Sequence, residues 1–424
     1  MTFLSRSIFI AATAALLLSA AAFANAETEK IAELKEKIAE RNTAIAELEK
    51  EIAGYQSDIE KTGKEAKSLQ GAIRTLDLEQ KKLAADIRLT ENRIIAVNLA
   101  IRELTEDISD KKIEIDQSRS AIGESLRSVD RLETSPLIMA LLSERTLGSF
   151  WEGVDNLERF QNGVREEVSR QEELKAGLES QKEKTEEKRR ELTKLKGKLS
   201  DQKQVLAISR TQKSKLLAST KNKESEYKKL LAQKVALRDS FERELLEFES
   251  ALRFEVDPTR LPPAGSGVLR WPLDSVKITQ QFGKTADSGR LYASGTHNGI
   301  DFRASVGTPV KAALSGTVKG TGNTDTVCPG ASYGRWVLIE HANGLSTLYA
   351  HLSLLKVETG QSIATGDTVG YAGETGYATG PHLHFTVYAT QGVRIMERKS
   401  SVCKGTYVMP IADLKAYLDP LKYL

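Results

Sequence analysis

The sequence predicts an α + β multidomain protein, with a long antiparallel coiled-coil hairpin first and an antiparallel β-sheet domain after it. The chain has 424 residues, more than one ordinary domain holds. Glu, Lys, Leu, Ile and Ala dominate the first part, whereas all five histidines and most glycines lie beyond about residue 260. The net charge of +3 is small, and no basic patch with interleaved aromatic residues is present, so nucleic acid is not an expected partner.

The first residues predict a secretory signal peptide. Arg6 precedes an apolar run over about residues 8–23, and Ala24-Asn25-Ala26 is a small-x-small cleavage site. The alternative is an uncleaved membrane anchor, because the run is nearly long enough to span a bilayer. We therefore expect export across the inner membrane and a periplasmic, envelope-associated protein.

A heptad repeat predicts the first coiled-coil arm. Stepping by seven from Ile31 to Ile115 gives isoleucine at eleven of thirteen positions, and offset positions such as Leu34, Leu69 and Leu104 are also apolar. Such a repeat is typical of helices that supercoil around a partner helix. At 1.5 Å per residue, one arm of this kind would be about 130 Å long.

The repeat fails around Pro136 and resumes further along, through Leu174, Leu192 and Leu245. The simplest geometry is a hairpin whose second arm returns antiparallel, and the rival is a parallel homodimer of each arm. The hairpin serves either as a spacer or as a docking arm for a partner. A Pro- and Gly-rich linker follows the second arm. The predicted segments are 1–26 signal peptide, 27–133 first arm, 134–160 helical turn region, 161–255 second arm, 256–268 linker and 269–424 β domain.

Short β-rich runs broken by glycine predict the C-terminal domain, for example VKITQQFG and TPVKAALSGTVKG. Asn343-Gly344 lies between two such runs and predicts a hairpin. Cys328 and Cys403 both lie in this domain, and in an exported protein they are expected to form a disulfide, with two free thiols as the alternative.

Four histidines fall in three short motifs of this domain: His297 and Asp301 in THNGID, His351 in YAHL, and His382 and His384 in PHLHF. In a strand, His382 and His384 share one face, so that one can bind a metal while the other stays beside it, and Leu383 points into the core. Nitrogen and carboxylate ligands without thiolate suit zinc, and three protein ligands leave a position for water, as in catalytic sites. The fifth histidine, His341, precedes a turn and is interpreted as structural.

The motifs HNGIDF, YGRWVLIEHANGLSTLYAHLS and GDTVGYAGETGYATGPHLHF together resemble the lysostaphin/LytM-type zinc peptidases of family M23, from about Leu269 to the C-terminus. The layout of signal peptide, two coiled-coil arms and this domain resembles EnvC-like proteins, which activate murein hydrolases. The resemblance implies one Zn²⁺ held by His297, Asp301 and His384. It also implies two unligated catalytic histidines, with His382 as general base and His351 orienting water or stabilising the oxyanion.

The implied function is an exported zinc metalloendopeptidase that hydrolyses peptidoglycan peptides. The alternative is a non-enzymatic activator of an amidase, with the amidase or a membrane-embedded division protein docking on the coiled coil. All five site positions are intact, which favours the enzyme. Thr386 stands where the family usually has glutamate, and because it is not a ligand we expect a minor effect. A helix around 225–255 folding back over the groove is a further hypothesis, suggested by the architecture.

Overall fold

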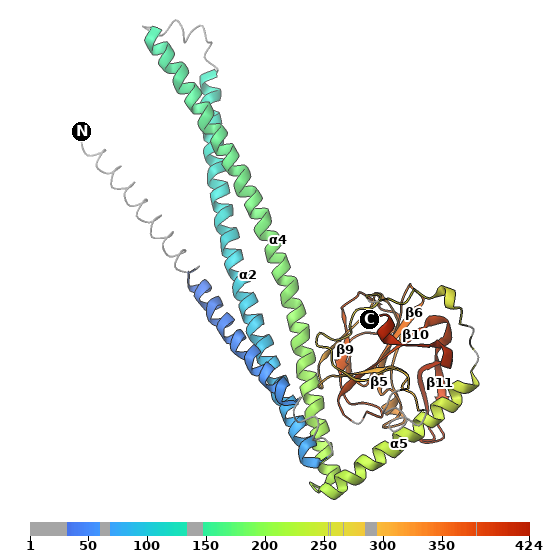
Figure 1. Cartoon of the computed structure of the whole chain (residues 1–424). Coiled ribbons are helices and arrows are strands. Elements are labelled where there is room, and N and C mark those ends of the chain that lie inside the picture. Colours follow the sequence, from blue (N-terminus) through green and yellow to red (C-terminus); the bar gives the residue numbers. More distant parts are fainter. Residues whose placement is uncertain are drawn as a thin grey trace. The chain divides into compact units, whose positions relative to one another are not determined.

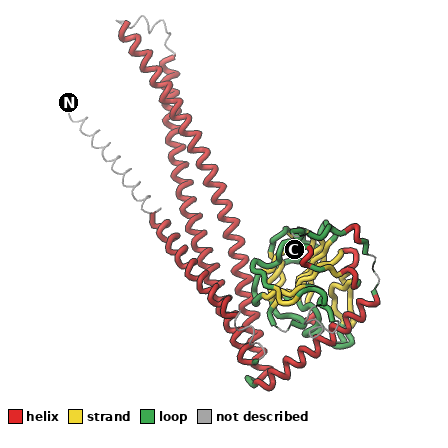
Figure 2. Tube along the Cα trace, in the orientation of Figure 1, coloured by secondary structure: helices red, strands yellow, loops and turns green. Residues whose placement is uncertain are grey.

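The computed structural model describes residues 32–59, 68–133, 147–252, 254, 256–265, 267–284, 295–378 and 380–424. The chain divides into two compact units, Met1–Glu47 with Leu89–Leu199 and Leu48–Arg88 with Ser200–Leu424. Long helices come first and the strands gather in the C-terminal domain, which confirms the predicted fold class (Figure 2). The predicted signal peptide and residues 134–146 of the turn region lie outside the described residues. Boundaries of the six predicted segments stay predictions.

Two helices, α2 (Leu69–Glu133) and α4 (Leu147–Thr220), pair antiparallel within each unit. In the first unit, Arg170 contacts Glu114 at 2.8 Å and Gln181 contacts Asp107 at 3.4 Å. In the second unit, the side chain of Gln202 donates to the Asp86 carbonyl at 3.4 Å, and Lys213 pairs with Asp77. Residue numbers rise along α4 as those of their partners fall along α2, so the hairpin is intramolecular.

The heptad repeat is not one straight arm, and the expected length of about 130 Å is wrong. A helix over residues 32–59 lies antiparallel to α2 instead. Lys35 is 3.8 Å from Glu103, Arg41 is 3.3 Å from Asn92, and Arg88 is 2.9 Å from Glu51. A continuous repeat specifies an apolar face but not which helix covers it. Here the apolar face of residues 32–59 packs on α2, and α2 also packs on α4.

The second arm is also divided. α4 ends at Thr220, and α5 (Glu224–Ala251) begins after a short turn (Figure 1). Lys221 and Asn222 have φ values of 46° and 56°, a left-handed backbone that ends an α-helix. This turn lets α5 leave the α2–α4 pair and pack on the β domain within the second unit.

The described residues of the β domain form three antiparallel sheets. In the largest, the strand order is β1 (Ile278–Gln280), β2 (Ile300–Arg303), β10 (His382–Ala389), β6 (Leu345–Ala350), β5 (Arg335–Glu340), β4 (Gly316–Asn323) and β8 (Ser362–Ile363), with β13 (Tyr417–Leu418) also paired to β10. The others are β3 (Pro309–Lys311), β9 (Thr368–Ala372) and β7 (Leu352–Leu355), and the hairpin of β11 (Val393–Lys399) and β12 (Thr406–Ala412). Short 3₁₀ helices lie at Pro258–Arg260, Thr324–Thr326, Thr390–Gly392, Leu414–Ala416 and Pro420–Lys422. The Asn343-Gly344 turn joins β5 to β6, as predicted, and Gly344 has a φ of 85° that favours glycine.

Two apolar clusters fill the β domain, and α5 completes the second. The first contains Leu383, which confirms its predicted inward orientation. The second joins Phe241 and Leu245 of α5 to Trp336, Tyr388 and other buried residues of the domain. Phe241 is only 1% exposed, so α5 is part of the domain's core rather than a loosely attached neighbour.

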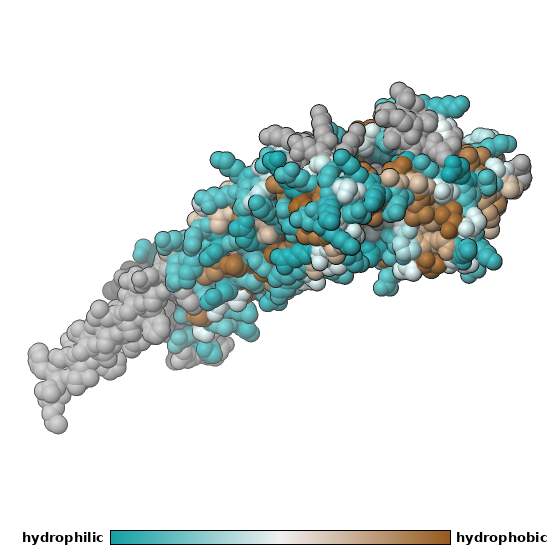
Figure 3. Space-filling view, turned by 90° about the horizontal axis from the view of Figure 1, so that it is seen from below, coloured by the Kyte–Doolittle hydropathy of each residue, from teal (hydrophilic) through white to brown (hydrophobic). Residues whose placement is uncertain are grey.

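The Cys328–Cys403 disulfide is present, as predicted, and joins residues 75 apart in the sequence. Cys403 lies between β11 and β12, so the bond ties this hairpin to the loop after β4. Among the described residues, no helix is both long and apolar enough to cross a bilayer. On the face drawn in Figure 3, the described residues are mostly hydrophilic, with apolar residues in small patches.

Candidate metal centre

Strand register brings the central residues of the site together. β2 and β10 are neighbours, and Asp301 lies directly opposite His384 in their antiparallel pairing. His297 precedes β2 and is held by two backbone hydrogen bonds to Gly283, at 2.8 and 3.0 Å. Side chains of opposed residues in an antiparallel pair point to the same face, so the register itself directs the Asp301 carboxylate at the His384 ring.

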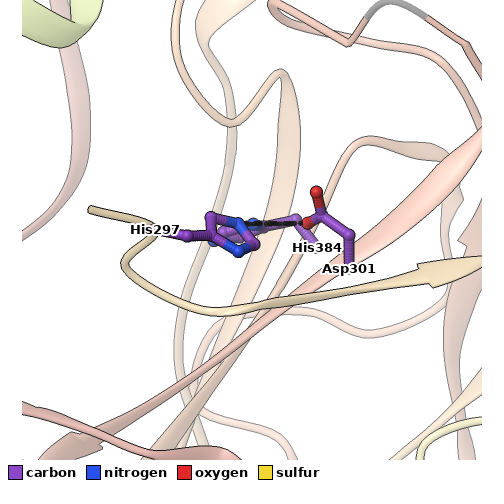
Figure 4. Close-up of side chains that lie close together, drawn as sticks. All are labelled: His297, Asp301 and His384. Carbon is purple, nitrogen blue, oxygen red and sulfur yellow. Dashed lines mark hydrogen bonds and ion pairs between the residues drawn. The ribbon is translucent and has the colours of Figure 1, made fainter. Parts of the chain in front are cut away.

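His297, Asp301 and His384 form a buried triangle of donor atoms (Figure 4). His384 Nδ1 is 2.9 Å from Asp301 Oδ1 and 3.1 Å from His297 Nε2. The third side, from His297 Nε2 to Asp301 Oδ1, is 3.3 Å. All three side chains point toward one another and together offer two imidazole nitrogens and one carboxylate oxygen.

This triangle fits zinc. Tetrahedral zinc with ligands at about 2.0–2.1 Å keeps those ligands about 3.3 Å apart, close to the three observed separations. The donor set contains no thiolate, which suits a catalytic rather than a structural zinc site. All three residues are buried, and the Asp301 side chain, at 10%, is the most exposed of them.

Each cluster histidine has a hydrogen-bond partner at its other ring nitrogen. His297 Nδ1 donates to the Gln281 carbonyl at 3.1 Å. His384 Nε2 lies 2.9 Å from Thr386 Oγ1. Such contacts fix the tautomer and the ring orientation of ligating histidines. The sequence predicted only a minor effect of Thr386 because it is not a ligand, although its place two residues after His384, on the same strand face, indicated a contact with that ring.

His382 and His351 lie beside the triangle. His382 Nε2 is 3.8 Å from Asp301 Oδ1, and the ring centroids of His351 and His382 are 4.6 Å apart. His382 Nδ1 donates to the Gly380 carbonyl at 2.8 Å, and His351 Nδ1 donates to the Thr375 carbonyl at 2.8 Å. The structure therefore gathers all five predicted side chains in one place, while their chemical roles stay predictions.

Burial dominates the electrostatics of the site. Burial alone would raise the pKa of Asp301, but the charges of His382 and His297 and the hydrogen bonds from His297 and His384 hold that pKa well below its usual range. Burial lowers the pKa of His384 and lowers the pKa of His351 well below the usual value. Both imidazoles are therefore neutral at pH 7, the form in which a histidine nitrogen can bind a metal or accept a hydrogen bond.

A group of buried tyrosines lies behind the triangle and was not predicted. The Tyr333 ring stacks on His384, with centroids 5.9 Å apart, and its hydroxyl contacts that of Tyr388 at 3.2 Å. The side chain of Asn298, next to His297, donates to the Tyr333 hydroxyl at 3.4 Å. Through these contacts, His384 and the residue next to His297 both pack against the buried tyrosines of the domain core.

α5 borders a cavity next to the triangle. The cavity has a volume of about 310 Å³ and is lined by Glu242, Leu245 and Glu249 of α5, by His297 and Asn298, and by further residues that include Tyr377. The hypothesis of a helix folded back near the groove therefore corresponds to a contact within the second unit.

His341 lies apart from the site and is structural, as interpreted from the sequence. Its Nδ1 donates to the Ser315 carbonyl at 3.0 Å, and its Nε2 lies 2.8 Å from Thr347 Oγ1. Both ring nitrogens are thus satisfied inside the domain, where His341 is 3% exposed.

Residues 295–396 match the profile of Peptidase family M23. DD-carboxypeptidase/endopeptidase Mpg of Neisseria meningitidis serogroup B is 40% identical over 114 residues, which are 27% of this chain and 25% of Mpg. Peptidoglycan DD-endopeptidase ShyA of Vibrio cholerae is 38% identical over 121 residues, 27% of this chain and 26% of ShyA. The chain thus spans about a quarter of the length of these relatives. The catalytic domain of lysostaphin from Staphylococcus simulans is 28% identical, with 34% of this chain and 90% of that domain covered and a TM-score of 0.25.

Proposed function

We propose that this chain, which carries an M23 peptidase domain over residues 295–396, is an exported zinc metalloendopeptidase that hydrolyses peptide bonds in peptidoglycan. The observation that carries the proposal is the buried triangle of His297, Asp301 and His384, with two further histidines beside it. The similarity to ShyA and Mpg, whose names describe peptidases, supports the reaction class. A domain that only bound a partner would gain nothing evident from five site residues held in this arrangement.

His297 Nε2, Asp301 Oδ1 and His384 Nδ1 would hold the metal. When bound, zinc polarises a carbonyl as a Lewis acid and lowers the pKa of water to about 7. The protein positions the substrate next to these groups and moves the protons. The two histidines outside the triangle are suited to the second task.

His382 fits the role of general base. Its Nδ1 hydrogen is committed to the Gly380 carbonyl, so in the neutral ring Nε2 carries the lone pair and can accept a proton. The His382 side chain is 19% exposed, whereas that of His384 is 3% exposed, so His382 is the more accessible of the two to substrate and water. Its Nε2 also lies on the side of Asp301, where the triangle is.

His351 fits the role of a fixed hydrogen-bond acceptor. Donation from its Nδ1 to the Thr375 carbonyl leaves Nε2 without a proton, and burial lowers the pKa of the ring well below its usual value. A neutral acceptor in this position can orient a water molecule. It would donate to an oxyanion only after gaining a proton, so we assign the orienting role to His351.

The wider setting completes the proposal. The predicted signal peptide directs the chain to the periplasm, and the α2–α4 hairpin offers a surface for an envelope partner such as an amidase or a membrane-embedded division protein. A hairpin that bound an amidase could serve to activate that amidase. Activation of an amidase is therefore the function that competes with peptide hydrolysis by this chain.

The test combines metal analysis with digestion of purified sacculi, with the products identified by mass. We expect about one zinc per chain and soluble peptide-cleavage products from the wild type. His382→Ala should retain zinc and lose about 10²–10⁴-fold in rate, because it removes the general base alone. His384→Ala should lose both zinc and activity.

His341→Gln is the matched control, because it changes a buried histidine of the same domain outside the site. It should keep both zinc and product formation. A folded wild-type sample that takes up no zinc, yet stimulates an amidase, would refute the peptidase and establish the activator in its place.

A further inference from the structure

The two ring nitrogens of His384 face different surroundings. Nδ1 lies in the triangle, 2.9 Å from Asp301 Oδ1 and 3.1 Å from His297 Nε2. Nε2 lies 2.9 Å from Thr386 Oγ1. His384 is 2% exposed and Thr386 is fully buried, so water does not compete for this contact.

Strand geometry places Thr386 there. His384 and Thr386 are two residues apart on β10, so their side chains share one face. Gly299 provides the space, because a Cβ at Gly299 would lie 2.7 Å from Thr386 Oγ1 and 2.8 Å from His384 Cε1. Threonine is also β-branched, which restricts its χ1 and keeps the hydroxyl in one direction.

A histidine that binds a metal through Nδ1 carries its proton on Nε2. A buried acceptor for that proton fixes the tautomer and the ring plane, whereas an apolar neighbour would leave the N–H without a partner. Among the described residues, the Thr386 hydroxyl lies within hydrogen-bond distance of Nε2, at 2.9 Å.

We propose that Thr386 is a positioning residue for the metal centre: its hydroxyl accepts the Nε2 hydrogen of His384 and thereby keeps Nδ1 directed at zinc. This inference rests on the proposed zinc site and differs from the expectation that Thr386 has a minor effect. It predicts that the hydroxyl, rather than the bulk of the side chain, determines metal affinity.

The experiment measures the zinc dissociation constant of the full chain by competition with a chelator. Thr386→Val keeps the shape and removes the hydroxyl, and it should weaken zinc binding about 10–100-fold. Thr386→Ser keeps the hydroxyl and should bind zinc nearly as tightly as the wild type. If the valine variant fails to fold, Thr386→Ala replaces it, and the serine variant should bind at least about ten times more tightly than the alanine variant.

Thr347→Val is the matched control. Thr347 Oγ1 also lies close to a histidine ring nitrogen, 2.8 Å from His341 Nε2, but at a histidine outside the triangle and with the hydroxyl donating, because His341 Nδ1 donates to the Ser315 carbonyl. This variant should lose stability but keep its zinc affinity. Equal zinc affinity of Thr386→Val and the wild type would overturn the inference while leaving the peptidase intact. A wild type that binds no zinc would overturn both.

Discussion

His351 combines its proposed role of orienting water with an unfavourable backbone conformation. Its φ is 59°, in the left-handed region that costs an ordinary residue about 1–2 kcal/mol. Its backbone N–H donates to the Tyr333 carbonyl at 2.9 Å, and its ring bonds to the Thr375 carbonyl. These contacts hold the residue in place at the end of β6, beside His382.

The strain at His351 makes a prediction that reverses the usual order of glycine and alanine. His351→Gly and His351→Ala both remove the ring, but only glycine adopts φ 59° without steric cost. The glycine variant should therefore be more stable than the alanine variant by about 1 kcal/mol in urea denaturation of the β domain. A more stable alanine variant would mean that the loop relaxes to negative φ when the ring is removed.

Glu249 is a buried carboxylate that makes α5 sensitive to pH. It accepts hydrogen bonds from Tyr417 Oη at 2.7 Å and from the Ala412 N–H at 3.2 Å. Burial raises the pKa of Glu249 to about 7, in spite of these bonds and of nearby Arg398, and Asp413 adds to the rise. The folded chain therefore holds this proton more tightly than the unfolded chain.

The pKa of Glu249 is 4.5 in the unfolded chain and about 7 in the folded chain. Its contribution to stability is therefore fully present below pH 4.5 and is lost as the pH rises through about 7. The shift corresponds to about 3 kcal/mol. We expect the amides of α5 to exchange hydrogen faster at pH 7.5 than at pH 5, beyond the intrinsic pH effect. In Glu249→Gln, which cannot ionise, this excess should shrink. Burial also raises the pKa of Glu79, to about 8. Glu79 therefore contributes the same dependence of stability on pH in the wild type and in the variant.

At the scale of elements, the sequence predicted which faces are apolar better than which elements cover them. The isoleucine repeat specified helices, but residues 32–59 turned back onto α2 because the repeat does not encode its partner. The alternation of His382, Leu383 and His384 specified the strand and its two faces. The spacing of His384 and Thr386 places both side chains on one face of β10, but the packing of Gly299 against them depends on a neighbouring strand, which the spacing does not encode.

The disulfide stabilises the element that receives α5. Glu244 of α5 pairs with the buried Arg398 of β11 at 2.9 Å and accepts from Ser400 Oγ at 2.9 Å, a few residues before Cys403. Closing a loop of 75 residues stabilises a fold by about 4 kcal/mol in the chain-entropy treatment. The double variant Cys328→Ala, Cys403→Ala should lose roughly 2–5 kcal/mol in urea unfolding. Addition of reductant should destabilise the wild type and leave the double variant unchanged. Equal stability of the wild type and the double variant without reductant would show that packing alone holds the β11–β12 hairpin.

At the scale of the whole molecule, α5 connects the helical hairpin to the β domain, and this connection touches the proposed active site. α5 follows α4 directly, packs Phe241 and Leu245 into the domain, and borders the cavity beside His297. The hairpin also contacts the domain directly, because Asp201 of α4 accepts from Lys356 Nζ at 2.8 Å and from Tyr371 Oη at 2.9 Å. Of these connections, α5 is the one that borders the cavity beside His297. If α5 restrains the groove, weaker attachment should raise peptidoglycan cleavage. If α5 is a permanent wall of the groove, weaker attachment should leave cleavage unchanged or lower it.

Glu244→Ala separates these outcomes in the full chain. It removes charge-assisted contacts to Arg398 and Ser400, worth about 2 kcal/mol, which raises the population of detached α5 about 30-fold. Glu247→Ala changes an exposed residue of the same helix and should leave both α5 and the rate as they are. We expect Glu244→Ala to release sacculus peptides faster than the wild type and to show faster amide exchange in α5. Faster exchange without faster cleavage would eliminate the restraining role, because α5 would then have detached without opening the site.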